Sequence, residues 1–222
     1  MQGGFPIDLI LFAMVAAFLV LRLRSVLGKR QGYERPPQAP GVPEARSTRV
    51  ENVTEDIARA RIDGPRRTLP ITSTPAGQAL SRIGAADPSF DPQGFLDGAE
   101  QAFRMIVEAF ARGDRQTLRS LLSDDTYAGF EGAVTAREQA QQSQRTEIRS
   151  IQEMAIEGAA LNGTLAEVTV RFVSDQVNIT TGSGNEVVAG TDAVTEVVDI
   201  WTFQRDVATK DPTWKLTATR SA

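Results

Sequence analysis

The chain has 222 residues, of which 41% are hydrophobic, and a formal net charge of −4 at pH 7. It contains no cysteine and no histidine, which excludes disulfides, thiolate zinc sites, cysteine nucleophiles and histidine-containing catalytic triads. Residues 22–86 have 12 Lys/Arg and 6 Asp/Glu, whereas residues 87–222 have 12 Lys/Arg and 21 Asp/Glu. A basic leader followed by an acidic region indicates two parts with different partners.

The first predicted element is a transmembrane helix over residues 3–23. Residues 3–21 are apolar except for Asp8 and, at ~1.5 Å per residue, would span about 28 Å of a hydrocarbon core about 30 Å thick. No Lys or Arg precedes this run and no small-residue cleavage site follows it, which favours an uncleaved anchor over a signal peptide. The expected membrane-anchor residues include Leu9, Phe12, Val15, Phe18 and Leu21.

Basic residues on the C-terminal side of this span set its predicted orientation. Arg22, Arg24, Lys29 and Arg30 all follow the apolar run. The positive-inside rule therefore predicts a single-pass protein of the inner (cytoplasmic) membrane with its C-terminal domain in the cytoplasm. The same four residues either contact anionic lipid head groups or do no more than fix the topology.

A disordered, Pro- and Arg-rich linker is predicted over residues 24–86. Its apolar residues are sparse and unpatterned, so it cannot bury enough surface to offset the entropy lost on ordering. Within it, only Val53, Ile57 and Ala60, and then Ala79, Leu80 and Ile83, could mark brief helices. The coil from Gly28 to Ala86, about 59 residues, has an r.m.s. reach of roughly 40 Å, so the linker would tether the following domain near the membrane.

Residues 87–222 are predicted to fold as one domain that begins with three helices. Asp91-Pro92 has the N-cap and first-turn proline of a helix that carries a wide apolar stripe and ends at Gly113. Asp114 opens a second, short helix. Asp124 or Asp125 is expected to cap a third helix.

From residue 148 onward the apolar residues recur at every second position, which predicts an antiparallel sheet with one buried face. Asn162-Gly163 and residues 182–185 have the composition of hairpin turns, and Ala189-Gly190 suggests a bulge. In the last strand, Trp214, Leu216 and Ala218 are expected to point inward. Helices followed by a sheet indicate an α+β domain.

A long helix lying across a curved sheet would leave a cone, and aromatic residues are the candidates to line its mouth. The residues expected to form a binding pocket are Phe103, Phe110, Trp201, Phe203, Trp214 and Leu216, with Asp199 as a polar group. Core packing is an equally good interpretation of the same residues, because aromatic residues at strand spacing usually belong to a core.

Five blocks of sequence resemble the C-terminal domain of the Tim44-like family, the motor-anchor subunit of the mitochondrial inner-membrane presequence translocase and its bacterial relatives. They are FDPQGFLDGAEQAFRMIVEAFARGD (90–114), LRSLLS (118–123), VTVRFVS (168–174), EVVDIWTFQRD (196–206) and DPTWKLTATR (211–220). The resemblance covers about residues 74–222, and the N-terminal anchor and proline-rich spacer resemble the bacterial, membrane-anchored form. It implies a cone-shaped fold of the nuclear-transport-factor-two-like kind with an apolar pocket.

The resemblance also implies an adaptor or binding module in protein translocation or membrane-protein handling, with no catalysis and no cofactor. The expected partners are the lipid bilayer, membrane proteins or translocating polypeptides, and a chaperone, with a homodimer as a further alternative. Nucleic acid is not expected, because the domain is acidic and the Arg-rich linker lacks interleaved aromatic residues. The alternative function is a small-molecule enzyme that uses a cavity carboxylate, Asp199 or Glu196, next to a donor such as Tyr127. No metal site is expected.

Overall fold

The computed structural model describes residues 64–221, which form an α+β domain of four helices and one five-stranded sheet. The elements in chain order are β1 (Arg66–Thr68), α3 (Pro75–Ala86), α4 (Pro92–Arg112), α5 (Arg115–Leu121), α6 (Asp124–Gln139), β2 (Ser143–Asn162), β3 (Leu165–Thr181), β4 (Val187–Asp206) and β5 (Lys215–Ser221). The predicted anchor over residues 3–23 lies outside the described residues. Within residues 64–221, no helix has the length and apolar character needed to cross a membrane.

The predicted helix boundaries agree with the structure, with one correction. The Asp91 carboxylate accepts a hydrogen bond of 2.7 Å from the Gly94 N–H at the start of α4, and Gly113 ends that helix with a φ of 71°. Asp114 caps α5, as expected. The cap of α6 is Ser123, because its side chain accepts from the Thr126 N–H, and the two aspartates expected there lie in the first turn instead.

The predicted linker is too long at its C-terminal end, because β1 and α3 lie within residues 24–86 and belong to the folded domain. Thr74 caps α3, and Leu80 and Ile83 of this helix join the hydrophobic core. β1 pairs in parallel with β2, with Arg66 opposite Glu153. Arg67 forms ion pairs with Asp97 and Glu100 of α4. β1 is only three residues long, too short to show the alternation of apolar and polar residues that predicts a strand. Only its contacts with β2 and α4 identify it.

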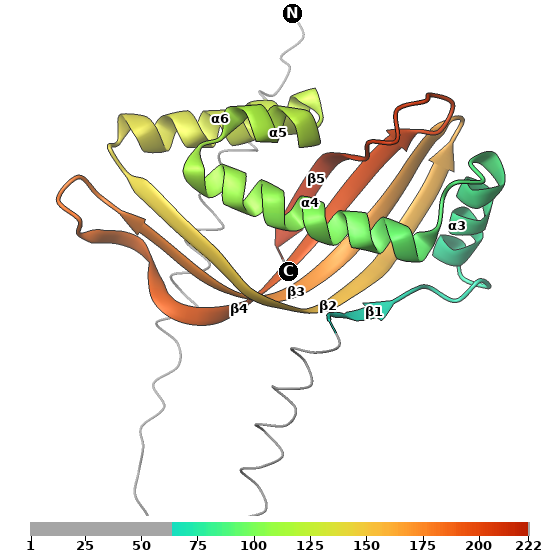
Figure 1. Ribbon diagram of the computed structural model, residues 1–222, viewed down its shortest axis with the longest axis horizontal. Helices are drawn as coiled ribbons and strands as arrows, with labels where there is room; N and C mark the ends of the chain where they lie inside the picture. The colour runs from blue at the N-terminus through green and yellow to red at the C-terminus, as the bar shows by residue number, and fades with distance from the viewer. Residues whose placement is uncertain (1–63, 222) are drawn as a thin grey trace, which may run out of the picture. The chain divides into compact units, whose positions relative to one another are not determined.

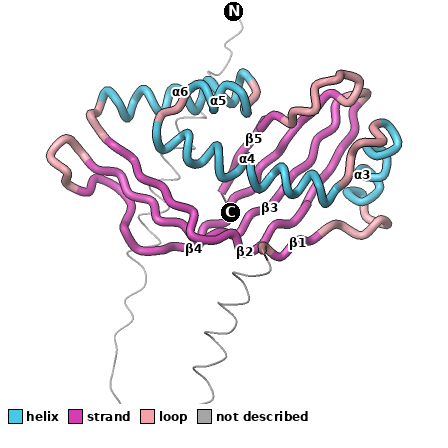
Figure 2. Tube along the Cα trace, in the orientation of Figure 1, coloured by secondary structure: helices cyan, strands magenta, loops and turns pink. Residues whose placement is uncertain are grey.

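The sheet has the order β1-β2-β3-β4-β5 and is antiparallel from β2 onward, with the predicted hairpins after Asn162 and Thr181. Register shifts interrupt the β2–β3 ladder at three points and the β3–β4 ladder at two. Because bulges bend a strand and increase its twist, these shifts account for the strong curvature of the sheet. Figures 1 and 2 show α4 lying across the concave face of the sheet.

β4 is longer than β5, the strand that pairs with its outer side. β5 pairs with β4 only from Asp199 to Gln204, so no described strand pairs with the outer side of residues 187–198, which we call the β4 free edge. The β4–β5 ladder has one register shift, between Thr202 and Phe203, opposite Thr217. This shift changes the alternation of side chains after Leu216, so Ala218 does not point into the core. The expectation that Ala218 points inward is therefore wrong, because Ala218 is exposed.

Gly190 has a backbone conformation and a close contact that a side chain would disturb. Its φ is +79°, and a Cβ at this position would lie 2.1 Å from the Asn178 carbonyl oxygen of β3. We expect Gly190→Ala to lower the free energy of unfolding in urea by about 1–2 kcal/mol for the left-handed conformation and by a further ~1–3 kcal/mol for the overlap.

Gly163→Ala is the matched control, because Gly163 has a φ of +62° but nothing within 4 Å of the added Cβ. This variant should show only the conformational part of the loss. If the two variants lost the same free energy of unfolding, β3 and β4 would be able to move apart at Gly190 without an energetic penalty.

Candidate functional site

The aromatic residues expected to line a pocket fill the core instead. Phe103 and Phe203 have exposed fractions of 0% and 1%, and Trp201 of 5%. The Phe103 ring stacks on Phe172 with 4.4 Å between ring centroids and lies 4.7 Å from Trp201. Leu216 is also fully buried. These side chains are in contact with one another, so the interpretation as core is the one that the structure favours.

Trp214 and Phe110 lie at the margin of this core and are partly buried. The Trp214 ring packs edge-on against Phe95, at 4.8 Å between centroids, and contacts Phe90. Phe110 packs edge-on against Phe130 of α6. Both tryptophans of the terminal hairpin thus fix β4 and β5 against α4 and the segment that precedes it.

Asp199 is the polar residue of the predicted set, and it is only partly buried. Ser221 donates a hydrogen bond of 3.4 Å to its carboxylate across the β4–β5 ladder. None of the seven predicted pocket residues lines either of the two surface hollows described next. Neither hollow is therefore formed by the residues expected to line a binding pocket.

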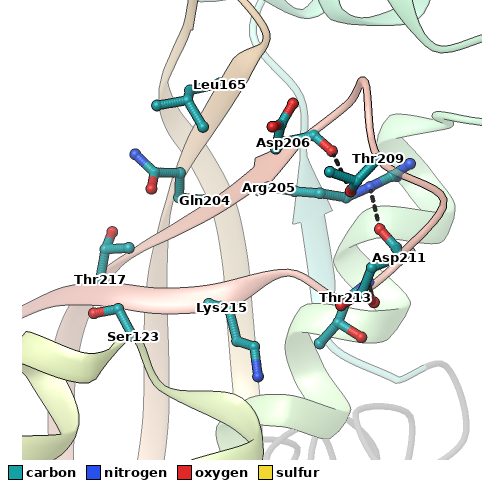
Figure 3. A pocket seen from close by; sticks show the side chains of 10 residues that line it. All are labelled: Ser123, Leu165, Gln204, Arg205, Asp206, Thr209, Asp211, Thr213, Lys215 and Thr217. Atoms are coloured by element: carbon teal, nitrogen blue, oxygen red, sulfur yellow. Dashed lines mark hydrogen bonds between the residues drawn. The ribbon is translucent and has the colours of Figure 1, made fainter.

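The larger hollow lies beside the β4–β5 loop and has a volume of about 280 Å³ (Figure 3). Its lining is mostly polar and comes from the start of β3, the end of β4, the β4–β5 loop, β5 and the N-cap of α6. The lining residues are Ser123, Leu165, Gln204, Arg205, Asp206, Thr209, Asp211, Thr213, Lys215 and Thr217.

The charged groups of this hollow already have partners within the domain. The Asp206 carboxylate accepts from the Ala208 N–H, and the Lys215 ammonium donates to the Ser120 carbonyl oxygen. Hydrogen bonds from the Thr213 side chain and N–H hold the pKa of Asp211 below its usual value. These interactions stabilise the loop, and they leave no carboxylate pair poised for proton transfer.

Arg205 links this loop to the turn between α3 and α4. Its guanidinium donates from Nε to the Asp211 carbonyl oxygen at 3.1 Å, and Nη1 lies 2.9 Å from Oδ2 of Asp87. The two side chains are only 11% and 10% exposed. The Ser89 hydroxyl donates to Asp87 at 2.6 Å, and this bond is the main reason why the pKa of Asp87 lies below its usual value, although burial opposes the shift.

A second hollow of about 200 Å³ lies between the end of α4 and the start of β2. Arg137 of α6 enters it and donates a hydrogen bond of 2.6 Å to the Phe110 carbonyl oxygen, and its guanidinium lies 5.1 Å from the centre of the Phe110 ring. Burial lowers the pKa of Arg137. The residue caps the C-terminal end of α4, which is a structural role.

Among residues 64–221, no three acidic, histidine or cysteine side chains lie close enough to hold a metal ion. The polar hollow was not anticipated from the sequence; its only signal is the charged Lys210-Asp211-Pro212 turn next to Trp214.

Comparisons with known proteins identify the domain. The family model described as "Tim44-like domain" matches residues 76–221, in agreement with the predicted range of about 74–222. No curated protein sequence matches the chain.

Two solved structures are distantly similar. The intermembrane space region of the chloroplast protein ARC6 has 11% identity and a TM-score of 0.42 and covers 60% of this chain and 98% of its own. A protein of the NTF2-like family from Streptomyces avermitilis has 14% identity and a TM-score of 0.37 and covers 59% of this chain and 97% of its own.

Proposed function

The chain belongs to the Tim44-like family, and on this premise we propose that it is a membrane-tethered adaptor that binds polypeptides in protein translocation or membrane-protein handling. The family match carries this proposal, because it covers residues 76–221 and so nearly all of the described domain. In this proposal the domain performs no chemistry and needs no cofactor. It lies at the cytoplasmic face of the inner membrane and follows a single span.

The sequence before the domain supports the tethering part of the proposal. Residues 3–23 have the length and composition of a membrane anchor, and the basic residues that follow them favour a cytoplasmic domain. Tethering a binding domain to a membrane raises its effective concentration near membrane partners to the order of millimolar. Such an arrangement benefits a binding module more than a metabolic enzyme.

The enzyme alternative requires a carboxylate in an apolar cavity with a raised pKa. Of the two candidates, Asp199 lies opposite Ser221 in the β4–β5 ladder and Glu196 is exposed, while Tyr127 is buried among core residues. The packing of the aromatic residues around Phe103 leaves the adaptor as the function that the domain supports better.

Deleting residues 3–23 from the full chain tests the proposal. We expect the wild-type chain in the membrane fraction after carbonate extraction and the deleted chain in the supernatant. Deleting residues 38–48 of the proline-rich spacer is the control and should leave the chain in the membrane. Wild-type chain in the supernatant would contradict the tether.

A photoreactive residue at Thr209, on the exposed β4–β5 loop, tests the adaptor part in living cells. We expect adducts with polypeptides that disappear when residues 3–23 are removed, because the partners are concentrated at the membrane. Adducts that are independent of the anchor and contain only small molecules would favour the enzyme instead.

A further inference from the structure

The β4 free edge, residues 187–198, has features of a surface that binds another strand. An edge strand directs alternate N–H and C=O groups away from its neighbour, where they can pair with an added strand. Three of the six large hydrophobic residues that are exposed in the described domain lie on this edge: Val187 is 57% exposed, Val188 44% and Val194 54%. Exposed valines on an unpaired edge are uncommon, because natural proteins normally protect such edges.

Two irregularities divide the edge into short stretches. β4 has one residue more than β3 at Val188 and, between Thr191 and Thr195, two residues more than β3 has between Asn178 and Gln176. Figure 1 shows the β3–β4 hairpin extending beyond α4. Because bulges interrupt pairing, the edge can accept a short strand, but it does not offer the long, regular ladder that two whole domains would need.

The charge of this region is of one sign. Residues 172–204 contain five acidic residues and neither Lys nor Arg. Glu186 and Asp192 lie at the two ends of the Val187–Thr191 stretch, six positions apart along the strand. At about 3.4 Å per residue of regular strand, six positions correspond to at most about 20 Å of backbone between Glu186 and Asp192.

The same two acids argue against a second copy of this chain as the partner. Antiparallel pairing of Val187–Thr191 with itself, in the register that overlaps the whole stretch, would centre on Ala189 and place Glu186 opposite Asp192 twice. Like charges directly opposite each other destabilise a strand pair. A segment with basic residues at its ends would instead place an opposite charge at each position.

We propose that the β4 free edge binds an extended polypeptide segment by β-strand addition, and that the segment has small or β-branched central residues with Lys or Arg about six positions apart. This inference rests on the proposed adaptor function, for which it names the chemistry of the client segment. The backbone of the edge supplies the ladder, and Glu186 and Asp192 select the basic ends.

Binding of a defined peptide to the full-length chain tests the proposal. The probe is a fluorescein-labelled peptide, Lys-Thr-Val-Thr-Val-Thr-Lys, and its controls are the same peptide with Glu at both ends and a version methylated on alternate backbone nitrogens. We expect the Lys-ended peptide to bind and both controls to fail. The Glu186→Lys/Asp192→Lys variant should bind the Lys-ended peptide roughly tenfold more weakly, because exposed ion pairs contribute ~0.2–1 kcal/mol each.

The charge-reversed variant should in turn gain affinity for the Glu-ended peptide, a rescue that a misfolded variant could not show. A Glu108→Lys/Asp125→Lys variant has the same change in net charge at helix positions and should bind like the wild type.

Single cysteines locate the bound peptide, since the chain has no cysteine of its own. Val188→Cys should form a disulfide with a peptide that has a central Cys, whereas Met105→Cys, at an equal 44% exposure on α4, should not.

The inference would be overturned if Val188→Cys and Met105→Cys formed disulfides with the peptide to the same extent. Equal affinities for the Lys-ended and Glu-ended peptides would also overturn it. A disulfide between two copies of the Val188→Cys chain would also overturn it, in favour of self-association. None of these outcomes alters the membrane fractionation, so the adaptor proposal stands or falls separately.

Discussion

Phe103→Ala should lower the free energy of unfolding of the full chain by about 3–5 kcal/mol, among the largest single losses we expect. The side chain is fully buried, stacks on Phe172 and contacts Trp201, so its removal leaves a cavity between α4 and two central strands. Urea denaturation followed by tryptophan fluorescence would measure the loss, because Trp201 lies against the removed ring.

Met105→Ala is the control on the same helix. Met105 is two positions further along α4 and 44% exposed, so its truncation should cost less than ~0.5 kcal/mol. A loss below about 1 kcal/mol for Phe103→Ala would contradict the packed aromatic core, and would reopen the interpretation of this region as a ligand cavity.

Arg205→Met should lower the free energy of unfolding by about 3 kcal/mol, the lower end of the range for breaking a buried ion pair. The substitution leaves the Asp87 carboxylate, which is 10% exposed, without its cationic partner and removes the hydrogen bond to the Asp211 carbonyl oxygen. Urea denaturation at pH 7 provides the measurement.

The double variant Arg205→Met/Asp87→Asn separates the cost of an unpaired charge from the cost of lost packing. It should regain most of the stability, because replacing both partners removes the uncompensated charge. A double variant as unstable as the single one would show that the ion pair is unimportant and that the Arg205 side chain acts through its packing.

The same pair gives a dependence of stability on pH. The pKa of Asp87 is lower in the folded chain than in the unfolded chain, so its ionised form stabilises the fold above the unfolded pKa of about 3.9. This stabilisation is lost as the pH falls through the lowered pKa. In Arg205→Met the pKa of Asp87 rises, so acid unfolding should begin at a higher pH than in the wild type.

Local signals in the sequence were sufficient for most of the helices and turns. Asp91-Pro92 and Gly113 bound α4 where expected, because a cap and a left-handed glycine act within a few residues of chain. Asn162-Gly163 predicted its hairpin for the same reason. Ser123 is a less evident cap in the sequence than the two aspartates that follow it, because both residue types suit that role.

Features that depend on distant contacts could not be read from the sequence. β1 is held by pairing with β2 and by ion pairs of Arg67 with α4, neither of which leaves a pattern in the sequence. The spacing of Ala79, Leu80 and Ile83 does suggest the helix α3, but it does not show that Leu80 and Ile83 join the core of the domain. The aromatic residues illustrate the same limit: strand spacing puts Trp201 and Phe203 on one face, but only the position of α4 decides whether that face is filled or open.

The position of β1 decides how mechanical force enters the domain. If the chain is tethered through its N-terminal segment as we propose, tension would load the three-residue strand β1 before it reaches the rest of the sheet. A break in this short ladder would not release the domain at once, because Arg67 also holds the chain to Asp97 and Glu100 on α4. Under such a force, β1 and the ion pairs of Arg67 would separate from the domain before the hydrophobic core unfolds.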